Sequence, residues 1–170
     1  ARPDHHYSAT RGKKDRGIDA VSPRPRNEVA LEVPGIIAAM AEERGRALAL
    51  LRDSTMSLGG VEERVLYDGF CREWTPAYYM GPRQLFHVHN FRSGLRATMF
   101  VGENTLQPVL LGSRGVPEEQ RLMVASTRGS RGTKQVKAPL ATLEDVVGFM
   151  EMVRAKLEFL KAGRTAGPVN

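Results

Sequence analysis

The chain has 170 residues, a formal net charge of +6 at pH 7 and 41% hydrophobic residues. This composition is typical of a folded domain, and no apolar run approaches the roughly 20 residues that a membrane helix needs. The single cysteine, Cys71, excludes an internal disulfide and a zinc site made of several cysteines, and it favours a reducing compartment, the cytoplasm or an organelle matrix. The positive charge is compatible with an anionic partner such as nucleic acid.

Residues 1–33 are rich in Arg, Lys, Pro, Gly and Asp and have neither helical nor strand periodicity. We expect an extended arm here, followed by one domain at 34–162 and a short tail at 163–170. The first residues also lack the apolar core of a secretory signal. The basic excess of the arm is concentrated at Arg11, Lys13, Lys14 and Arg16.

A helical pattern begins at Pro34, and its apolar spacing predicts one amphipathic helix to about Arg52. After Gly59-Gly60, several segments alternate apolar and polar residues as strands do. The segment FRSGL predicts a tight turn between two antiparallel strands. The expected strands are 61–70, 72–81, 84–91, 94–102 and 107–112.

The last third of the chain predicts helices around a loop. Pro117-Glu118-Glu119 indicates a helix start, with the helix running to about Ser126. A glycine-rich loop and the short strand KQVKAPL follow. Thr142 is the expected N-cap of a long helix to about Lys161, with Gly163 as its stop. A block of strands flanked by helices predicts an α+β fold, a curved antiparallel sheet with helices packed on one face.

Three blocks between about residues 60 and 160 carry a resemblance to a known family. They are ERVLYDGF, PRQLFHVHNFRSGLRATMF and KQVKAPLATLEDVVGFMEMVRAKLEFL. They resemble the first strand, the central hairpin and the terminal strand and helix of the YdhG-like domains of unknown function, whose fold is compared with that of frataxin. The resemblance implies an α+β fold and no particular activity, since none of the blocks is a catalytic signature.

The segment LFHVHNF holds two histidines one residue apart, His87 and His89. Strand residues at this spacing share a face, so we expect both on the open, solvent-facing side of the sheet, opposite the apolar residues that alternate with them. Two imidazoles can bind a metal, and Asp68 or Cys71 of a neighbouring strand could complete the set. The spacing alone is more typical of a surface strand than of a metal site.

The segment TRGSRGTKQVK is the second candidate site. From Arg121 to Lys137 the chain contains five basic residues and no acid. Glycines let a backbone approach phosphate closely, and Arg, Ser and Thr donate hydrogen bonds to it. The spacing of a phosphate-binding Walker loop is absent. The residues expected to contact phosphate here are Arg128, Arg131, Lys134 and Lys137.

No motif of a hydrolase, metalloprotease or dinucleotide-binding enzyme occurs, so we expect a non-enzymatic protein without a cofactor. The leading interpretation is a small accessory subunit that docks through its arm and basic loop onto a larger protein or ribonucleoprotein assembly, contacting RNA or DNA phosphates. In a variant, residues 23–34 lie across a protein partner. The alternative is a small-molecule or metal-binding domain that uses the open sheet face around His87 and His89.

Overall fold

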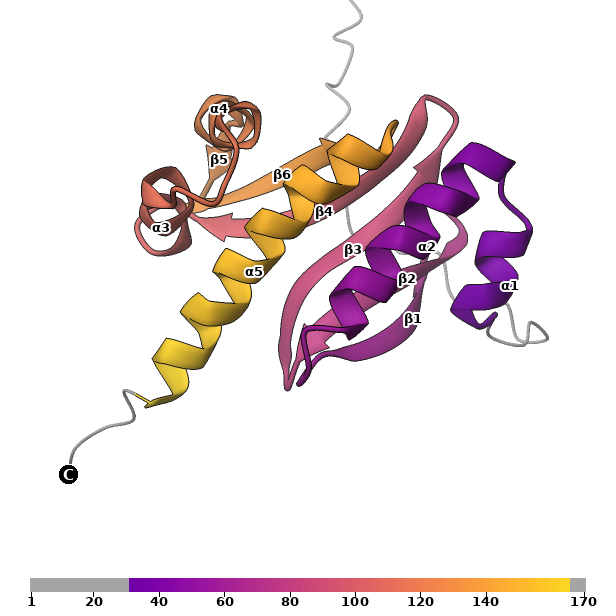
Figure 1. Ribbon diagram of the computed structural model, residues 1–170, viewed down its shortest axis with the longest axis horizontal. Helices are drawn as coiled ribbons and strands as arrows, with labels where there is room; N and C mark the ends of the chain where they lie inside the picture. The colour runs from indigo at the N-terminus through magenta and orange to yellow at the C-terminus, as the bar shows by residue number, and fades with distance from the viewer. Residues whose placement is uncertain (1–30, 166–170) are drawn as a thin grey trace, which may run out of the picture.

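The computed structural model describes residues 31–165, with side chains for residues 31–163. Five helices and six strands follow one another along this part of the chain (Figure 1). They are α1 (Val33–Ala38), α2 (Glu42–Met56), β1 (Glu62–Asp68), β2 (Glu73–Met80), β3 (Arg83–Phe91), β4 (Gly94–Gly102), α3 (Leu106–Gly112), α4 (Glu118–Ser126), β5 (Gly129–Ser130), β6 (Thr133–Pro139) and α5 (Leu143–Thr165).

The strands form one open antiparallel sheet in the order β1-β2-β3-β4-β6-β5. The helices α2 and α5 lie across one face of this curved sheet (Figure 1). The predicted α+β class is therefore confirmed. The predicted FRSGL turn is confirmed as well, because Phe91 pairs with Gly94 and leaves a two-residue connection. None of the helices within residues 31–165 has both the length and the apolar character that a membrane span requires.

The helix-covered face of the sheet carries the hydrophobic core. Tyr78 of β2 and Phe86 of β3 are fully buried, and their rings stack with centroids 4.8 Å apart. Phe86 also meets Phe149 of α5 edge to face at 5.2 Å. Because side chains alternate along a strand, Phe86 points to the helices while His87 and His89 point to the other face. The predicted sidedness of this strand is confirmed.

The single helix expected from Pro34 to Arg52 is wrong, because this segment forms two helices, α1 and α2, joined by a turn at residues 39–41. Gly45 lets the two helices pack closely, since a Cβ at this position would lie 3.1 Å from the carbonyl oxygen of Ile37. Two short helices that pack on the same core bury apolar residues at the same sequence spacing as one long helix would. The periodicity therefore did not reveal the turn.

The strand expected at 107–112 is also wrong, because this segment lies in α3. Leu106 and Leu110, one helical turn apart, are both buried. Pro108 fits the first turn, where its missing N–H has no intrahelical partner to lose. The burial of two leucines from one helical face outweighs the β propensity of Val109 and its neighbours.

The start of α5 follows the prediction, and its end does not. Thr142 Oγ1 accepts a hydrogen bond from the backbone N of Asp145 at 3.1 Å. Asp145 Oδ2 in turn accepts from the backbone N of Ala141 at 2.9 Å and of Thr142 at 3.0 Å, which is a capping box. The helix then continues through Gly163 to Thr165, so Gly163 is not its stop.

The contact between Phe86 and Phe149 leads to a stability prediction. Replacing Phe86 with Ala should lower the free energy of unfolding by about 3–5 kcal/mol, because it removes a buried ring and leaves a cavity beneath α5. Urea denaturation followed by circular dichroism measures the change. The control is Phe70→Ala, at a side chain that is 87% exposed, where we expect little change. Equal losses in the two variants would contradict this account of the core.

Candidate functional site

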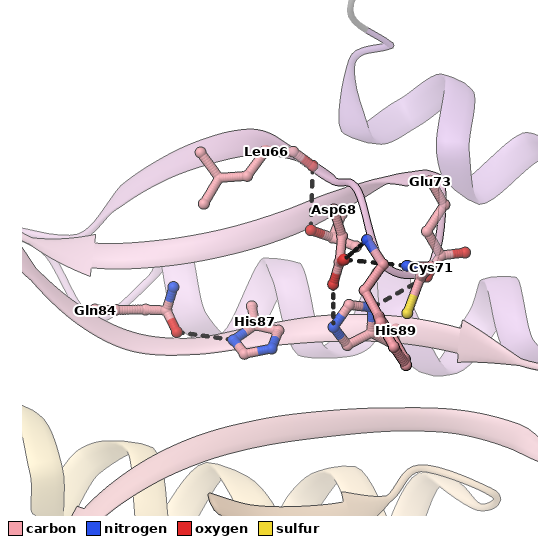
Figure 2. Close-up of polar contacts among 9 residues, drawn as sticks. Leu66, Asp68, Cys71, Glu73, Gln84, His87 and His89 are labelled. Atoms are coloured by element: carbon pink, nitrogen blue, oxygen red, sulfur yellow. Dashed lines mark hydrogen bonds and ion pairs between the residues drawn. The ribbon is translucent and has the colours of Figure 1, made fainter. Parts of the chain in front are cut away.

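A cluster of ionisable side chains lies on the face of the sheet that the helices leave open (Figure 2). Asp68 is the last residue of β1 and Glu73 the first of β2, and the two are paired across the hairpin. Cys71 lies in the loop between them. His87 and His89 come from β3, with ring centroids 4.9 Å apart. Strand pairing therefore brings residues from three separate segments to one place.

The loop between β1 and β2 is organised by the carboxylate of Asp68. Its Oδ1 accepts hydrogen bonds from the backbone N of Phe70 at 2.8 Å and of Cys71 at 3.1 Å. Arg72 adopts a φ of 53°, in the left-handed region, before the chain enters β2. Oδ1 is thus engaged by the loop, whereas Oδ2 lies toward His89.

His89 lies between two carboxylates. Its Nδ1 is 3.1 Å from Glu73 Oε1, and its Nε2 is 3.3 Å from Asp68 Oδ2. Its side chain is only 8% exposed, so the expectation that both histidines face solvent is wrong for His89. The β1–β2 loop, which the strand pattern alone did not place, packs against this imidazole and buries it.

Two carboxylate oxygens face the two ring nitrogens of His89. A neutral imidazole carries one N–H and donates to one carboxylate only. Its second nitrogen then presents a lone pair to the other carboxylate oxygen, and two electron-rich atoms at such a distance repel each other. Either a second ring proton or a bound cation between Asp68 Oδ2 and Nε2 removes this repulsion.

Cys71 completes a set of three metal-ligand side chains. One ligand atom from each of Asp68, Cys71 and His89 lies within 4.8 Å of the other two. Ligands about 2.0–2.3 Å from a tetrahedral zinc ion are separated by roughly 3.3–3.7 Å, so small side-chain rotations bring the three atoms to binding distance. Within the described part of the chain, no other three such side chains meet this spacing.

His87 is oriented by a hydrogen-bond chain rather than by the metal-ligand set. A register shift between Tyr78 and Tyr79 of β2 brings Gln84 to the same face as His87. Gln84 Nε2 donates to Tyr79 Oη at 3.0 Å, and its Oε1 lies 2.8 Å from His87 Nδ1. Burial, with a smaller effect of His89, lowers the pKa of His87 to about 4, so the ring is neutral at pH 7.

The environment of Cys71 is unsuited to a nucleophile. Burial, together with the carboxylates of Asp68 and Glu73, raises the pKa of the Cys71 thiol. The thiol is therefore protonated at neutral pH, whereas a catalytic cysteine needs a lowered pKa. A bound metal ion would reverse this preference, since a coordinating thiol loses its proton.

Lys134 was expected to contact anions, and this expectation is wrong because its side chain is buried and bonded to backbone carbonyls. Its residue is 6% exposed, and its Nζ donates to the carbonyl oxygens of Val124 at 2.9 Å and Ala125 at 3.3 Å. Both carbonyls belong to the last turn of α4, where backbone acceptors have no N–H partner within the helix. Along β6 side chains alternate, and that of Lys134 points to the helix side of the sheet.

The other basic residues of this segment are exposed. Arg128 and Arg131 flank β5, and Arg131 with Gly132 forms the two-residue turn into β6. Lys137 is paired with Thr98, which is paired with His87, so Lys137 shares the open face with the histidines. Thr98 itself is buried, and its hydroxyl has no hydrogen-bond partner within residues 31–163.

The four basic residues predicted for the arm, Arg11, Lys13, Lys14 and Arg16, lie outside the described residues. Residues 31–165 contain 18 Lys and Arg against 15 Asp and Glu. Half of the net charge of +6 thus belongs to residues 1–30. The described domain is close to electrically balanced, so its charge alone is weak support for an anionic partner.

Two residues of interest were missed in the sequence. The contact of Glu73 with His89 joins β2 to β3 and is not local in the sequence, although the place of Glu73 beside the β1–β2 turn is a signal for it. Lys156, inside the apolar stripe of α5, is buried at 6% exposure, and its Nζ donates to the carbonyl oxygen of Phe100 at 2.9 Å. A lysine between apolar helix positions was the available signal.

The role of Lys134 is testable by stability. Lys134→Met keeps much of the aliphatic chain but leaves two carbonyls of α4 without their donor, so the free energy of unfolding should fall by about 1–3 kcal/mol. Lys137→Met, at an exposed position of the same strand, should change it by less than about 0.5 kcal/mol. Thermal or urea denaturation of the pair measures the difference. If the Lys134 variant is as stable as the Lys137 variant, the structural role of Lys134 is contradicted, and anion binding becomes its expected role again.

We compared the chain with protein-family models, with curated proteins and with solved structures. No family model, curated protein or solved structure matched it. The resemblance to the YdhG-like domains stays a prediction, and similarity to other proteins assigns no function to the site on the open face.

Proposed function

We propose that this chain is a metal-binding domain, with Asp68, Cys71 and His89 as ligands of one zinc-class transition-metal ion. The observation that carries the proposal is the position of His89 between two carboxylates, with the Cys71 thiol beside it. A divalent ion between Asp68 Oδ2 and His89 Nε2 removes the repulsion between these two atoms.

The orientation of each ligand supports the proposal. Asp68 uses Oδ1 on the loop backbone, which leaves Oδ2 for a metal. The proton of His89 belongs on Nδ1, where Glu73 Oε1 accepts it at 3.1 Å, and this leaves the lone pair of Nε2 free for the metal. Carboxylates that hold the second nitrogen of a metal-binding histidine in this way fix its ring and raise its basicity.

The ligand types select the class of ion. Calcium and magnesium prefer oxygen ligands, whereas thiolate and imidazole favour zinc and its neighbours in the first transition row. Three protein ligands leave a fourth position of a tetrahedral site open. Asp68 also borders a hollow of about 310 Å³ together with Thr75, Gln84, His87 and Phe100. The hollow thus adjoins one of the three proposed ligands.

Cobalt(II) provides a direct test, because a thiolate ligand gives it an intense near-ultraviolet charge-transfer band. The wild-type protein should bind one equivalent and show this band, and Cys71→Ser should remove it. Glu73→Gln should weaken binding about 10–100-fold, since it changes the partner of His89 without removing a ligand. Absorption titration of purified metal-free protein measures both effects.

His87→Ala is the matched control, because His87 lies on the same strand and face but outside the proposed ligand set. Its titration should resemble that of the wild type.

Metal binding should also strengthen by about tenfold per pH unit near neutrality, since the Cys71 thiol must release its proton to coordinate. A wild-type protein that binds no cobalt, or a Cys71→Ser variant that keeps the band, would rule out the site.

We propose a second function, an interaction module that contacts nucleic-acid phosphates through Arg128, Arg131 and the basic arm. The turn at Arg131 supports it. Arg131 and Gly132 have φ values of 54° and 79°, a conformation in which Asn-Gly is the favoured pair. Arginine is less favourable than asparagine in this left-handed conformation, so contact with a partner explains the exposed Arg131 better than the geometry of the turn does.

A salt titration tests this second function with a single-stranded RNA oligonucleotide. Arg128→Ala with Arg131→Asn should weaken binding and reduce the slope of log K against log salt by about 1.4, since each lost phosphate contact accounts for about 0.7. Deleting residues 1–26 should weaken it further. The control is Arg154→Ala on α5, whose guanidinium pairs with Glu151. Binding that is insensitive to salt and to all these changes would exclude phosphate contact.

A further inference from the structure

Strands β3 and β4 separate before they end. Their pairing extends from Phe91 with Gly94 to His87 with Thr98 and stops there. Residues 83–86 of β3 and 99–102 of β4 are thus not paired with each other. The long helix α5 runs across the gap where the two strands diverge (Figure 1). Side chains from both strands and from α5 therefore meet at this end of the sheet.

Lys156 of α5 substitutes for the missing strand contact. Its Nζ donates to the carbonyl oxygen of Phe100, a residue of β4 beyond the paired region, at 2.9 Å. An ammonium group has three N–H donors, so two are left for other acceptors. Within residues 31–163, no carboxylate lies within salt-bridge distance of Nζ. Burial alone lowers the pKa of Lys156 to about 8, which reflects the absence of an acidic neighbour.

Lys156 borders a hollow of about 510 Å³ between the separated strands and α5. None of its lining residues is acidic, and Arg83 is the one other charged group among them. Gln84 and Thr105 contribute polar groups, while Phe100 and Phe159 belong to its apolar walls. The hollow thus combines cationic groups with an apolar surface, which is the usual character of a small-ligand site.

We propose that this hollow binds a small carboxylic acid with an apolar chain, whose carboxylate pairs with the Lys156 ammonium. A buried charge without a counter-ion is costly, and an anion from solution offsets that cost. Arg83 at the same hollow adds attraction, and Phe100 and Phe159 offer contact to the apolar chain. The lining of the hollow does not include Asp68, Cys71 or His89. This proposal is therefore tested independently of the proposed metal site.

Hexanoate and hexanol are the probes, because they differ mainly in the charged group. Wild-type protein should bind hexanoate at least about tenfold more tightly than hexanol, since a charge-assisted hydrogen bond is stronger than one between neutral groups. Lys156→Met should remove this preference while keeping the apolar volume. Lys161→Met, at an exposed position of the same helix, should keep it. Isothermal calorimetry or ligand-observed NMR measures the affinities.

The pH dependence tests the charge without a mutation. Hexanoate affinity should fall as pH rises through about 8, where the Lys156 ammonium loses its proton, whereas hexanol affinity should not change. Strands β3 and β4 and helix α3 contribute one titratable side chain to the hollow, Arg83, which stays charged throughout. Equal affinities for the two probes, a preference that survives in Lys156→Met, or no saturable hexanoate binding would overturn the proposal.

Discussion

The two-residue alternation of β3 is the constraint on which the other features depend. Phe86 points into the core and meets Tyr78 and Phe149, so the register of the strand is tied to the packing of α5. The same alternation places His87 and His89 on the open face. Shifting the strand by one residue would move aromatic rings to solvent and imidazoles into the core. Core stability therefore holds the candidate metal ligand in place.

The open face is less exposed than its lack of helices suggests. The hairpin loop between β1 and β2 bends over β3, and its path is fixed by the Asp68 carboxylate, which accepts hydrogen bonds from the backbone N–H groups of Phe70 and Cys71. The loop buries His89, and burial together with the carboxylates of Asp68 and Glu73 raises the pKa of the Cys71 thiol. The end of β1 and the loop thus hold the Asp68 carboxylate and the Cys71 thiol beside the His89 imidazole.

Three basic residues near β6 illustrate how similar side chains take different roles. Lys134 satisfies the carbonyls that end α4, whereas Lys137 lies on the open face, three residues along the strand. Lys156 satisfies a carbonyl of β4 where pairing with β3 ends. Two of these amines thus complete backbone hydrogen bonding at places where a helix or a ladder stops. Net charge gives no indication of this division.

Local periodicity and local hydrogen bonding predict the α+β class, four of the five expected long strands, the tight turn after Phe91, the helix at Glu118 and the capping box of α5. The sequence also indicated that His87 and His89 share a face. Only the folded chain shows that α1 packs back on α2, that residues 107–112 are helical, that Glu73 meets His89, and that Lys156 borders a hollow. These features depend on which segments pack together, and residues far apart in the chain carry no local signal of their contact.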